Sequence, residues 1–266
     1  MTDSTATLNH VTSKDGTTIG FDRLGSGPPV VLVCGGSVDR QSNAGLAAAL
    51  ASELTVFNYD RRGRGDSGDT LPYAIEREVE DIAAVVEAAG GSAGLYGISS
   101  GGALALHAAA ALPGAVRRLA IYEAPYFVNP EFRPPLDSVA QYEKRLAAGH
   151  PEEAAEYFMA EVVRMPPDFV AWVKSQPFFA DSVNVAHTLP YDGRVMGDYL
   201  VPTELAGRVA APTLVLAGGA DFPFMPETAQ AIATAIPNAR YVHVEGQGHA
   251  VEPAAIAPLL REFFAE

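Results

Sequence analysis

Short apolar runs alternate along the chain with segments whose apolar positions recur at helical spacing. The runs expected to form strands are Thr17–Leu24, Pro29–Val33, Leu54–Tyr59, Ala93–Tyr96, Val116–Tyr122, Pro212–Ala217 and Arg240–Val244. The segments expected to form helices are Ala44–Ser52, Ile75–Ala89, Gly102–Leu112, Glu227–Ile236 and Pro253–Phe264. Continuous apolar runs such as Pro29–Val33 are typical of strands that are buried on both faces. This alternation predicts an α/β fold with a mostly parallel central sheet and helices on both faces.

The segment between Asn129 and Leu205 breaks the alternation, because it contains no convincing buried strand. Helical patterns punctuated by prolines fill it instead, over Leu136–Ala148, Pro151–Arg164 and Asp168–Ser175. We interpret residues 129–205 as a helical cap, or lid, inserted into a core domain made of residues 1–128 and 206–266. Most aromatic side chains of this cap are expected to form its own core. Phe178 and Phe179, which we expect in a loop, are predicted to line an apolar substrate pocket.

A pentapeptide with candidate chemistry, Gly97-Ile98-Ser99-Ser100-Gly101, stands between a predicted strand and a predicted helix. G-x-S-x-G in this context is typical of a nucleophile elbow, a tight turn that exposes the serine hydroxyl. The small flanking residues allow the strand and the helix to pass close together. A free serine hydroxyl is a poor nucleophile and needs an adjacent base. The pattern therefore predicts Ser99 as a nucleophile with a histidine nearby.

Histidine suits the role of base because its ordinary pKa lies near neutrality. The six candidates are His10, His107, His150, His187, His243 and His249. Only His249 follows the last predicted strand on a glycine-containing loop, where it can reach a nucleophile at the carboxyl edge of the sheet. We therefore predict His249 as the base.

Charge and cysteine content narrow the partners and the compartment. The 266 residues include 32 acidic and 18 basic side chains, for a net charge of −14. Phosphate binding requires a basic face, so this balance argues against nucleic acids and anionic membranes as partners. The polar start, Met1–His10, predicts no signal peptide, and no run is apolar enough to span a membrane. The single cysteine, Cys34, rules out an internal disulfide and favours a cytoplasmic location, and no Cys/His cluster has metal-ligand spacing.

The order of these local patterns resembles the α/β-hydrolase fold family from about Thr17 to Phe264. The matches, in the family's order, are Val31–Gly36, Tyr59–Ser67, Tyr96–Gly102, Leu214–Asp221 and Gly246–His249. The chain is most similar to cap-bearing esterases and hydrolases of small molecules. This resemblance implies a serine hydrolase that cleaves a carboxylic ester or lactone of a small apolar or aromatic molecule through an acyl-enzyme. It implies no cofactor and no metal.

The resemblance also suggests roles for residues around the nucleophile. The family's chain order and the loop length favour Asp221 as the acid that orients His249. Glu123 is the alternative, since some members of the family carry the acid there; otherwise it would line the substrate pocket beneath the cap or pair with a cap residue. The oxyanion-hole donors would be the backbone amides of Gly36 and Ser100, and Ser37 could add a hydroxyl to the pocket.

Several alternatives stay open. Cys34 stands where the family usually has histidine, and we interpret it as a small buried residue. The charged loop Asp60–Ser67 is expected to be structural, with its charges paired to one another, and an arginine site for a substrate carboxylate is the alternative. The same residues fit a carbon–carbon bond hydrolase, a thioesterase, a perhydrolase, an acyltransferase, or a ligand-binding or cyclase-type protein with little hydrolysis. The oligomeric state is open between a monomer and a homodimer.

Overall fold

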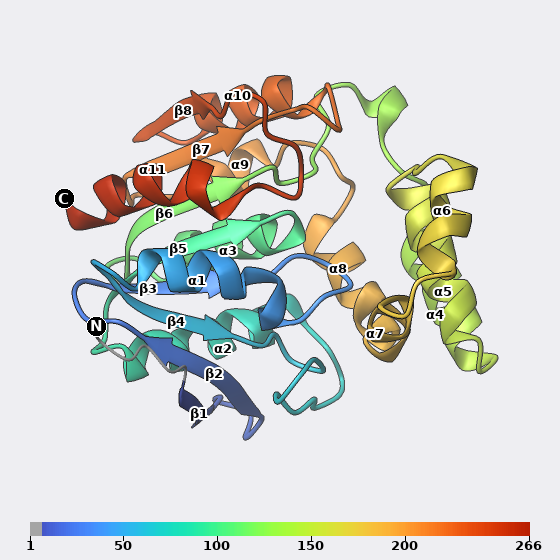
Figure 1. The fold of residues 1–266 in the computed structure, drawn as a ribbon, viewed down its shortest axis with the longest axis horizontal. Coiled ribbons are helices and arrows are strands. Elements are labelled where there is room, and N and C mark those ends of the chain that lie inside the picture. The colour runs from blue at the N-terminus through green and yellow to red at the C-terminus, as the bar shows by residue number, and fades with distance from the viewer. Residues whose placement is uncertain (1–6) are drawn as a thin grey trace.

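The computed structural model describes residues 7–266. Met1–Ala6, which belong to the polar start for which no signal peptide was predicted, lie outside the described residues. Within the described residues, eight strands form one sheet in the order β1-β2-β4-β3-β5-β6-β7-β8 (Figure 1). The strands are β1 Thr7–Thr12, β2 Thr18–Leu24, β3 Pro29–Val33, β4 Thr55–Tyr59, β5 Ala93–Ile98, β6 Val116–Tyr122, β7 Thr213–Ala217 and β8 Ala239–His243. The pairs β1–β2 and β2–β4 are antiparallel, and all other pairs are parallel. The prediction of a mostly parallel sheet is confirmed.

Both faces of the sheet are covered, which explains the continuous apolar runs in its central strands. In β3, Val31 and Val33 belong to one core layer, while Val30 and Leu32 belong to the other. Successive side chains of a strand point to opposite faces, so a strand between two apolar layers needs apolar residues at every position.

Each core layer is completed by its own helices. On one face lie α1 Ala44–Leu50 and α11 Pro253–Ala265, and on the other lie α2 Ile75–Ala88, α3 Ser100–Ala111 and α10 Met225–Ala235. The short 3-10 helix η1 Arg40–Asn43 leads into α1. These elements match the predicted helices to within a few residues at each end.

The insertion between β6 and β7 is helical, as predicted, and its helices from 138 to 184 stand beyond the carboxyl ends of the parallel strands (Figure 1). They are α4 Ser138–Ala147, α5 Pro151–Tyr157, α6 Pro167–Lys174, α7 Phe179–Asn184, α8 Leu189–Met196 and α9 Thr203–Ala206. We call these helices the cap. Buried Tyr142 and Leu189 belong to an apolar cluster that is separate from the layers of the sheet. Helix α8 of the cap packs against α3 of the core.

Candidate active site

Residues 97–101 form a tight strand–turn–helix at the carboxyl end of β5. Ser99, between β5 and α3, has φ 56° and ψ −133°, a conformation that is strained for a residue with a side chain. A Cβ atom on Gly97 would lie 2.3 Å from the Gly101 carbonyl oxygen, and one on Gly101 would lie 2.3 Å from the Cys34 carbonyl oxygen. Only glycine fits at both positions, so the turn presents a half-buried Ser99 in the geometry expected of a nucleophile elbow.

The loop after β3 passes directly against this turn. A Cβ atom on Gly35 would lie 3.1 Å from Cβ of Ser99, and one on Gly36 would lie 3.4 Å from Oγ of Ser100. The structure therefore brings Gly36 and Ser100, the two predicted oxyanion-hole residues, close together beside Ser99. The next residue, Ser37, is buried and has a left-handed φ of 59°.

The imidazole of His249 is held by Glu123, which follows β6 directly. Nδ1 of His249 lies 2.8 Å from Oε2 of Glu123, whose side chain is fully buried. The other oxygen, Oε1, accepts hydrogen bonds from the backbone N–H groups of Gly218 (3.0 Å) and Gly219 (2.9 Å). The glutamate thus links the loop after β7 to the histidine loop.

Asp221 does not contact the imidazole, which corrects the preference for it as the orienting acid. Its Oδ2 accepts a hydrogen bond from the backbone N–H of His249 at 2.9 Å. Its carboxylate packs so closely on Gly248 that a Cβ atom there would lie 2.1 Å from Oδ2. Asp221 therefore orders the backbone of the histidine loop. Glu123, the alternative candidate for the acid, contacts the imidazole with its fully buried carboxylate.

A buried ion cluster lies behind the elbow and joins the cap to the core. Asp192 of α8 accepts hydrogen bonds from Nη1 of Arg61 (2.7 Å) and Nη2 of Arg64 (2.8 Å). Arg61 also makes two bonds to Glu78 of α2, at 2.7 and 2.8 Å. All four side chains are almost completely buried, and their charges sum to zero. Unpaired, such charges would be costly to bury.

This cluster contacts both segments that carry the predicted oxyanion-hole residues. The Ser100 hydroxyl donates to Oδ1 of Asp192 at 2.8 Å, and Nη1 of Arg64 donates to the Gly35 carbonyl at 2.6 Å. Burial alone would raise the pKa of Asp192, but Arg64, Arg61 and the Ser100 hydroxyl together hold it below its ordinary value. The sequence analysis missed Asp192, because it lies 131 residues from Arg61 and no local spacing connects them.

The charged loop Asp60–Ser67 is structural, as expected, but its partners come from other segments. Asp60 binds Arg40 of η1 through a backbone and a side-chain bond. Arg62 binds Asp81 of α2 at 2.8 Å. The loop's arginine side chains are at most 1% exposed, which leaves them no access to a substrate carboxylate.

Cys34 is fully buried, and burial raises the pKa of its thiol, which fits the interpretation as a small packed residue.

The structure places the two phenylalanines predicted to line a pocket within the cap. Phe178 is 49% exposed and packs edge-on to Trp172, while Phe179 packs against the apolar clusters of the cap. These neighbours of Phe178 and Phe179 are other cap residues. Both side chains thus pack in the way that was expected for most aromatic residues of the cap.

Across residues 7–266, no group of three or more His, Cys, Asp or Glu side chains is arranged to hold a metal ion. Over the same residues, no helix has the length and apolar character needed to cross a membrane.

Comparisons with known proteins bear on the family and the fold of the chain. The model of the "Alpha/beta hydrolase family" matches residues 30–259. The crystal structure of an alpha/beta hydrolase from Sphaerobacter thermophilus is 51% identical, with a TM-score of 0.91 over 96% of this chain and 100% of that chain. A pimeloyl-[acyl-carrier protein] methyl ester esterase from Stenotrophomonas maltophilia is 30% identical over 86% of this chain and 89% of its own length. The polyketide synthase ThaQ of Burkholderia thailandensis is 30% identical over 88% of this chain. The match covers only 12% of the length of that synthase.

Proposed function

We propose that this chain, which belongs to the alpha/beta hydrolase family, is a serine hydrolase of small carboxylic esters or lactones. In this proposal Ser99, His249 and Glu123 form the catalytic triad. The observation that carries the proposal is the 2.8 Å contact between His249 Nδ1 and the buried carboxylate of Glu123. An acid in that position fixes the tautomer and the orientation of the imidazole, so that Nε2 is the nitrogen that accepts a proton. The similarity to an esterase from Stenotrophomonas maltophilia supports an ester as the substrate.

In the proposed reaction, Oγ of Ser99 attacks the carbonyl carbon while its proton passes to Nε2 of His249. Glu123 stabilises the imidazolium that forms. The tetrahedral intermediate collapses, the carbon–oxygen bond to the alcohol breaks, and the imidazolium protonates the leaving oxygen. Water then attacks the acyl-enzyme with His249 again as base, which releases the acid and restores Ser99.

The backbone N–H groups of Gly36 and Ser100 are the proposed donors to the oxyanion. Such donors contribute most when they are fixed before the reaction begins. The cluster of Asp192, Arg61 and Arg64 supplies that rigidity in the proposal, because it binds the Ser100 hydroxyl and the Gly35 carbonyl at once. The pairing of two arginines with two carboxylates, Asp192 and Glu78, also keeps a lone negative charge away from the developing oxyanion.

Covalent labelling tests the proposal. A fluorophosphonate should modify the protein once, at Ser99, and Ser99→Ala should abolish both labelling and the hydrolysis of p-nitrophenyl acetate. The matched control is Ser175→Ala, which alters an exposed serine of the cap and should leave both unchanged. Labelling at another residue, or ester hydrolysis that survives in Ser99→Ala, would contradict the proposal.

A further inference from the structure

The ring of Phe222 packs against the imidazole of His249. The centroids of the two rings lie 5.7 Å apart, and the ring planes are perpendicular, at 90°. A perpendicular arrangement at this separation is one of the two that aromatic pairs prefer. Phe222 directly follows Asp221 in the loop after β7, and its side chain is partly buried. The proposed triad makes no use of this contact, although it involves the residue that is proposed to act as the base.

The hydrogen bond to Glu123 restrains the imidazole at one atom, since it joins Nδ1 of His249 to Oε2 of the glutamate at 2.8 Å. The position of a histidine ring depends on two torsion angles, χ1 and χ2, and χ2 has a broad range of low-energy values. One distance cannot fix two torsion angles, and the side chain of His249 is 30% exposed. A second contact on the ring is therefore needed to keep Nε2 in one place, and Phe222 makes such a contact.

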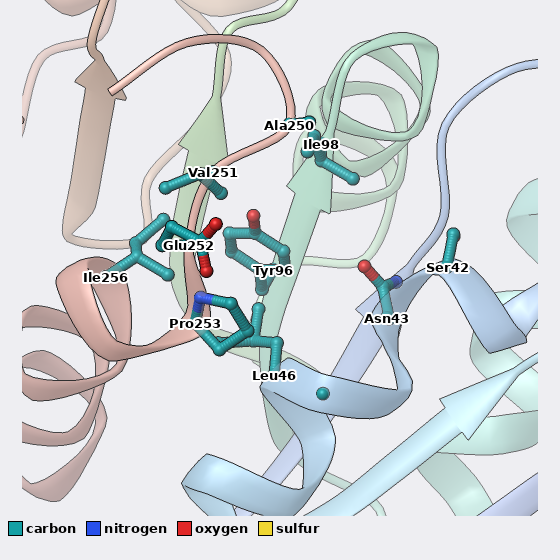
Figure 2. A pocket seen from close by; sticks show the side chains of 11 residues that line it. Ser42, Asn43, Leu46, Tyr96, Ile98, Ala250, Val251, Glu252, Pro253 and Ile256 are labelled. Atoms are coloured by element: carbon teal, nitrogen blue, oxygen red, sulfur yellow. The ribbon is translucent and has the colours of Figure 1, made fainter. Parts of the chain in front are cut away.

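The chain directly after His249 borders a cavity of about 260 Å³ (Figure 2). Ala250 and Val251 line this cavity together with Ile98 at the end of β5. Atoms that face open space have no packing partners on that side, so this part of the loop gains little restraint from the cavity. The orientation of the imidazole therefore depends on the contacts of its own ring, among them the one with Phe222.

Phe222 is held in turn by two further aromatic rings. Its centroid lies 6.1 Å from that of Phe224, which stacks on Phe127 with centroids 4.7 Å apart. The backbone of Phe127 is bonded in both directions: its N–H donates to the Tyr199 carbonyl at 2.8 Å, and its carbonyl accepts from the N–H of Val201 at 3.3 Å. A row of three rings thus runs to the imidazole from the point where the chain enters and leaves the cap, which fixes the place of Phe222.

We propose that Phe222 is a positioning residue for the hydrolysis: its ring holds the imidazole of His249 in the orientation from which Nε2 exchanges a proton with Oγ of Ser99. The inference rests on the proposed function, because the orientation of the ring matters for catalysis only if His249 is the base. Proton transfer requires hydrogen-bond geometry between the two groups, so a freely tilting imidazole would spend less time in the productive position. A purely structural Phe222 would merely fill space, and another apolar side chain would then replace it without loss of activity.

Kinetics of two Phe222 variants with p-nitrophenyl acetate provide the first test. Phe222→Leu keeps an apolar side chain but removes the ring. We expect it to lower kcat about tenfold and to change KM less than about twofold, because a misplacement of about 1 Å can cost up to about 100-fold in rate. Phe222→Tyr keeps the ring and should retain most of kcat. An effect confined to kcat separates positioning of the imidazole from binding of the substrate.

The matched control is Phe169→Leu, which makes the same change in the cap. Phe169 is 46% exposed and also packs against one aromatic ring, that of Trp172 at 5.3 Å, so its replacement should leave kcat and KM unchanged. Circular dichroism and urea unfolding give the concentration of folded protein for each variant, and kcat is referred to it. An unchanged kcat in Phe222→Leu would overturn the proposal. An equal loss in Phe222→Leu and Phe222→Tyr would also overturn it, because the loss would then not depend on the ring.

The order of the imidazole can also be measured without turnover, which separates this inference from the proposed function. In ¹⁵N-labelled protein, the Nδ1–H resonance of His249 should exchange with water faster and broaden in Phe222→Leu, and should stay sharp in Phe222→Tyr and Phe169→Leu. If a fluorophosphonate labels Ser99 but Phe222→Leu changes neither kcat nor this resonance, the positioning role is refuted and the proposed function stands. If Ser99 resists labelling but the resonance broadens in Phe222→Leu alone, Phe222 orders the imidazole and the triad proposal fails.

Discussion

Replacing Asp192 by asparagine should destabilise the protein and weaken catalysis together. The substitution keeps the shape of the side chain but removes one of two negative charges that offset Arg61 and Arg64. Arg61 keeps its two bonds to Glu78, whereas Arg64 loses its carboxylate partner among the described residues and keeps bonds to backbone carbonyls. Leaving one buried charge unpaired costs about 3–5 kcal/mol. We expect a loss near the lower end, about 3 kcal/mol.

Urea unfolding measures this loss. Trp172, the only tryptophan, lies in α6 and reports on the cap, while circular dichroism reports on the whole fold. The matched control is Glu143→Gln, which breaks an exposed ion pair with Arg194 of the same helix as Asp192 and should cost less than about 1 kcal/mol. Equal losses for the two substitutions would refute the view that the buried cluster fastens α8 to the core.

Activity of the folded Asp192→Asn variant tests the second half of the argument. Asp192 binds the Ser100 hydroxyl and, through Arg64, the loop that carries Gly36, so the proposed oxyanion donors should lose their alignment. Removing one such donor costs about 100-fold or more in kcat, and misalignment should cost at least about tenfold with little change in KM. An unchanged kcat below the unfolding transition would show that the cluster is irrelevant to catalysis.

Three further predictions follow from particular side chains. Burial opposes ionisation of Asp15, but hydrogen bonds from Thr17 and Arg62 outweigh it and lower the pKa of Asp15 to about 2. The stabilisation that ionised Asp15 contributes is therefore present above the unfolded pKa near 4 and is lost as the pH falls through about 2. Asp15→Asn should lower the free energy of unfolding by up to about 1 kcal/mol at pH 7 and leave it unchanged near pH 2. A difference in urea midpoint between the two proteins that stays constant with pH would contradict this. Because Cys34 is buried with a raised thiol pKa, dithionitrobenzoate should react only with unfolded protein, and rapid reaction of the native protein would refute its packed position. Because Phe178 is half exposed within the cap, Phe178→Ser should change kcat/KM for aromatic esters less than about twofold, and a large rise in KM for these esters alone would restore its predicted place in a pocket.

The fold and the turn at Ser99 were predictable because their signals are local. Apolar alternation sets the strands, and the spacing of Gly97 and Gly101 matches the close approach of β5 and α3. The place of His249 after the last strand follows from the same alternation.

The choice between Asp221 and Glu123 as the partner of the histidine was not predictable, because it depends on how neighbouring strands end in space. Glu123 has a left-handed φ of 44° at the end of β6, which lies between β5 and β7, and there its side chain reaches both the β7 loop and the imidazole. Asp221 has the more familiar spacing, yet its loop turns the carboxylate toward the backbone of His249. Asp192 was missed for another reason: charged residues are rarely buried, and its arginine partners lie far away in the sequence.

The most direct test of the triad compares Glu123→Gln with Asp221→Asn in one ester assay. The concentration of folded protein is measured for each variant beforehand, so that kcat refers to folded molecules. Both substitutions exchange a carboxylate for an amide, so each controls for the other. The account predicts that Glu123→Gln lowers kcat by up to about 10⁴-fold, because the imidazole loses its orienting charge. Asp221→Asn should retain most of its kcat, since only a bond to the backbone of His249 is weakened. An inactive Asp221→Asn beside an active Glu123→Gln would contradict the account and return the role of the acid to Asp221.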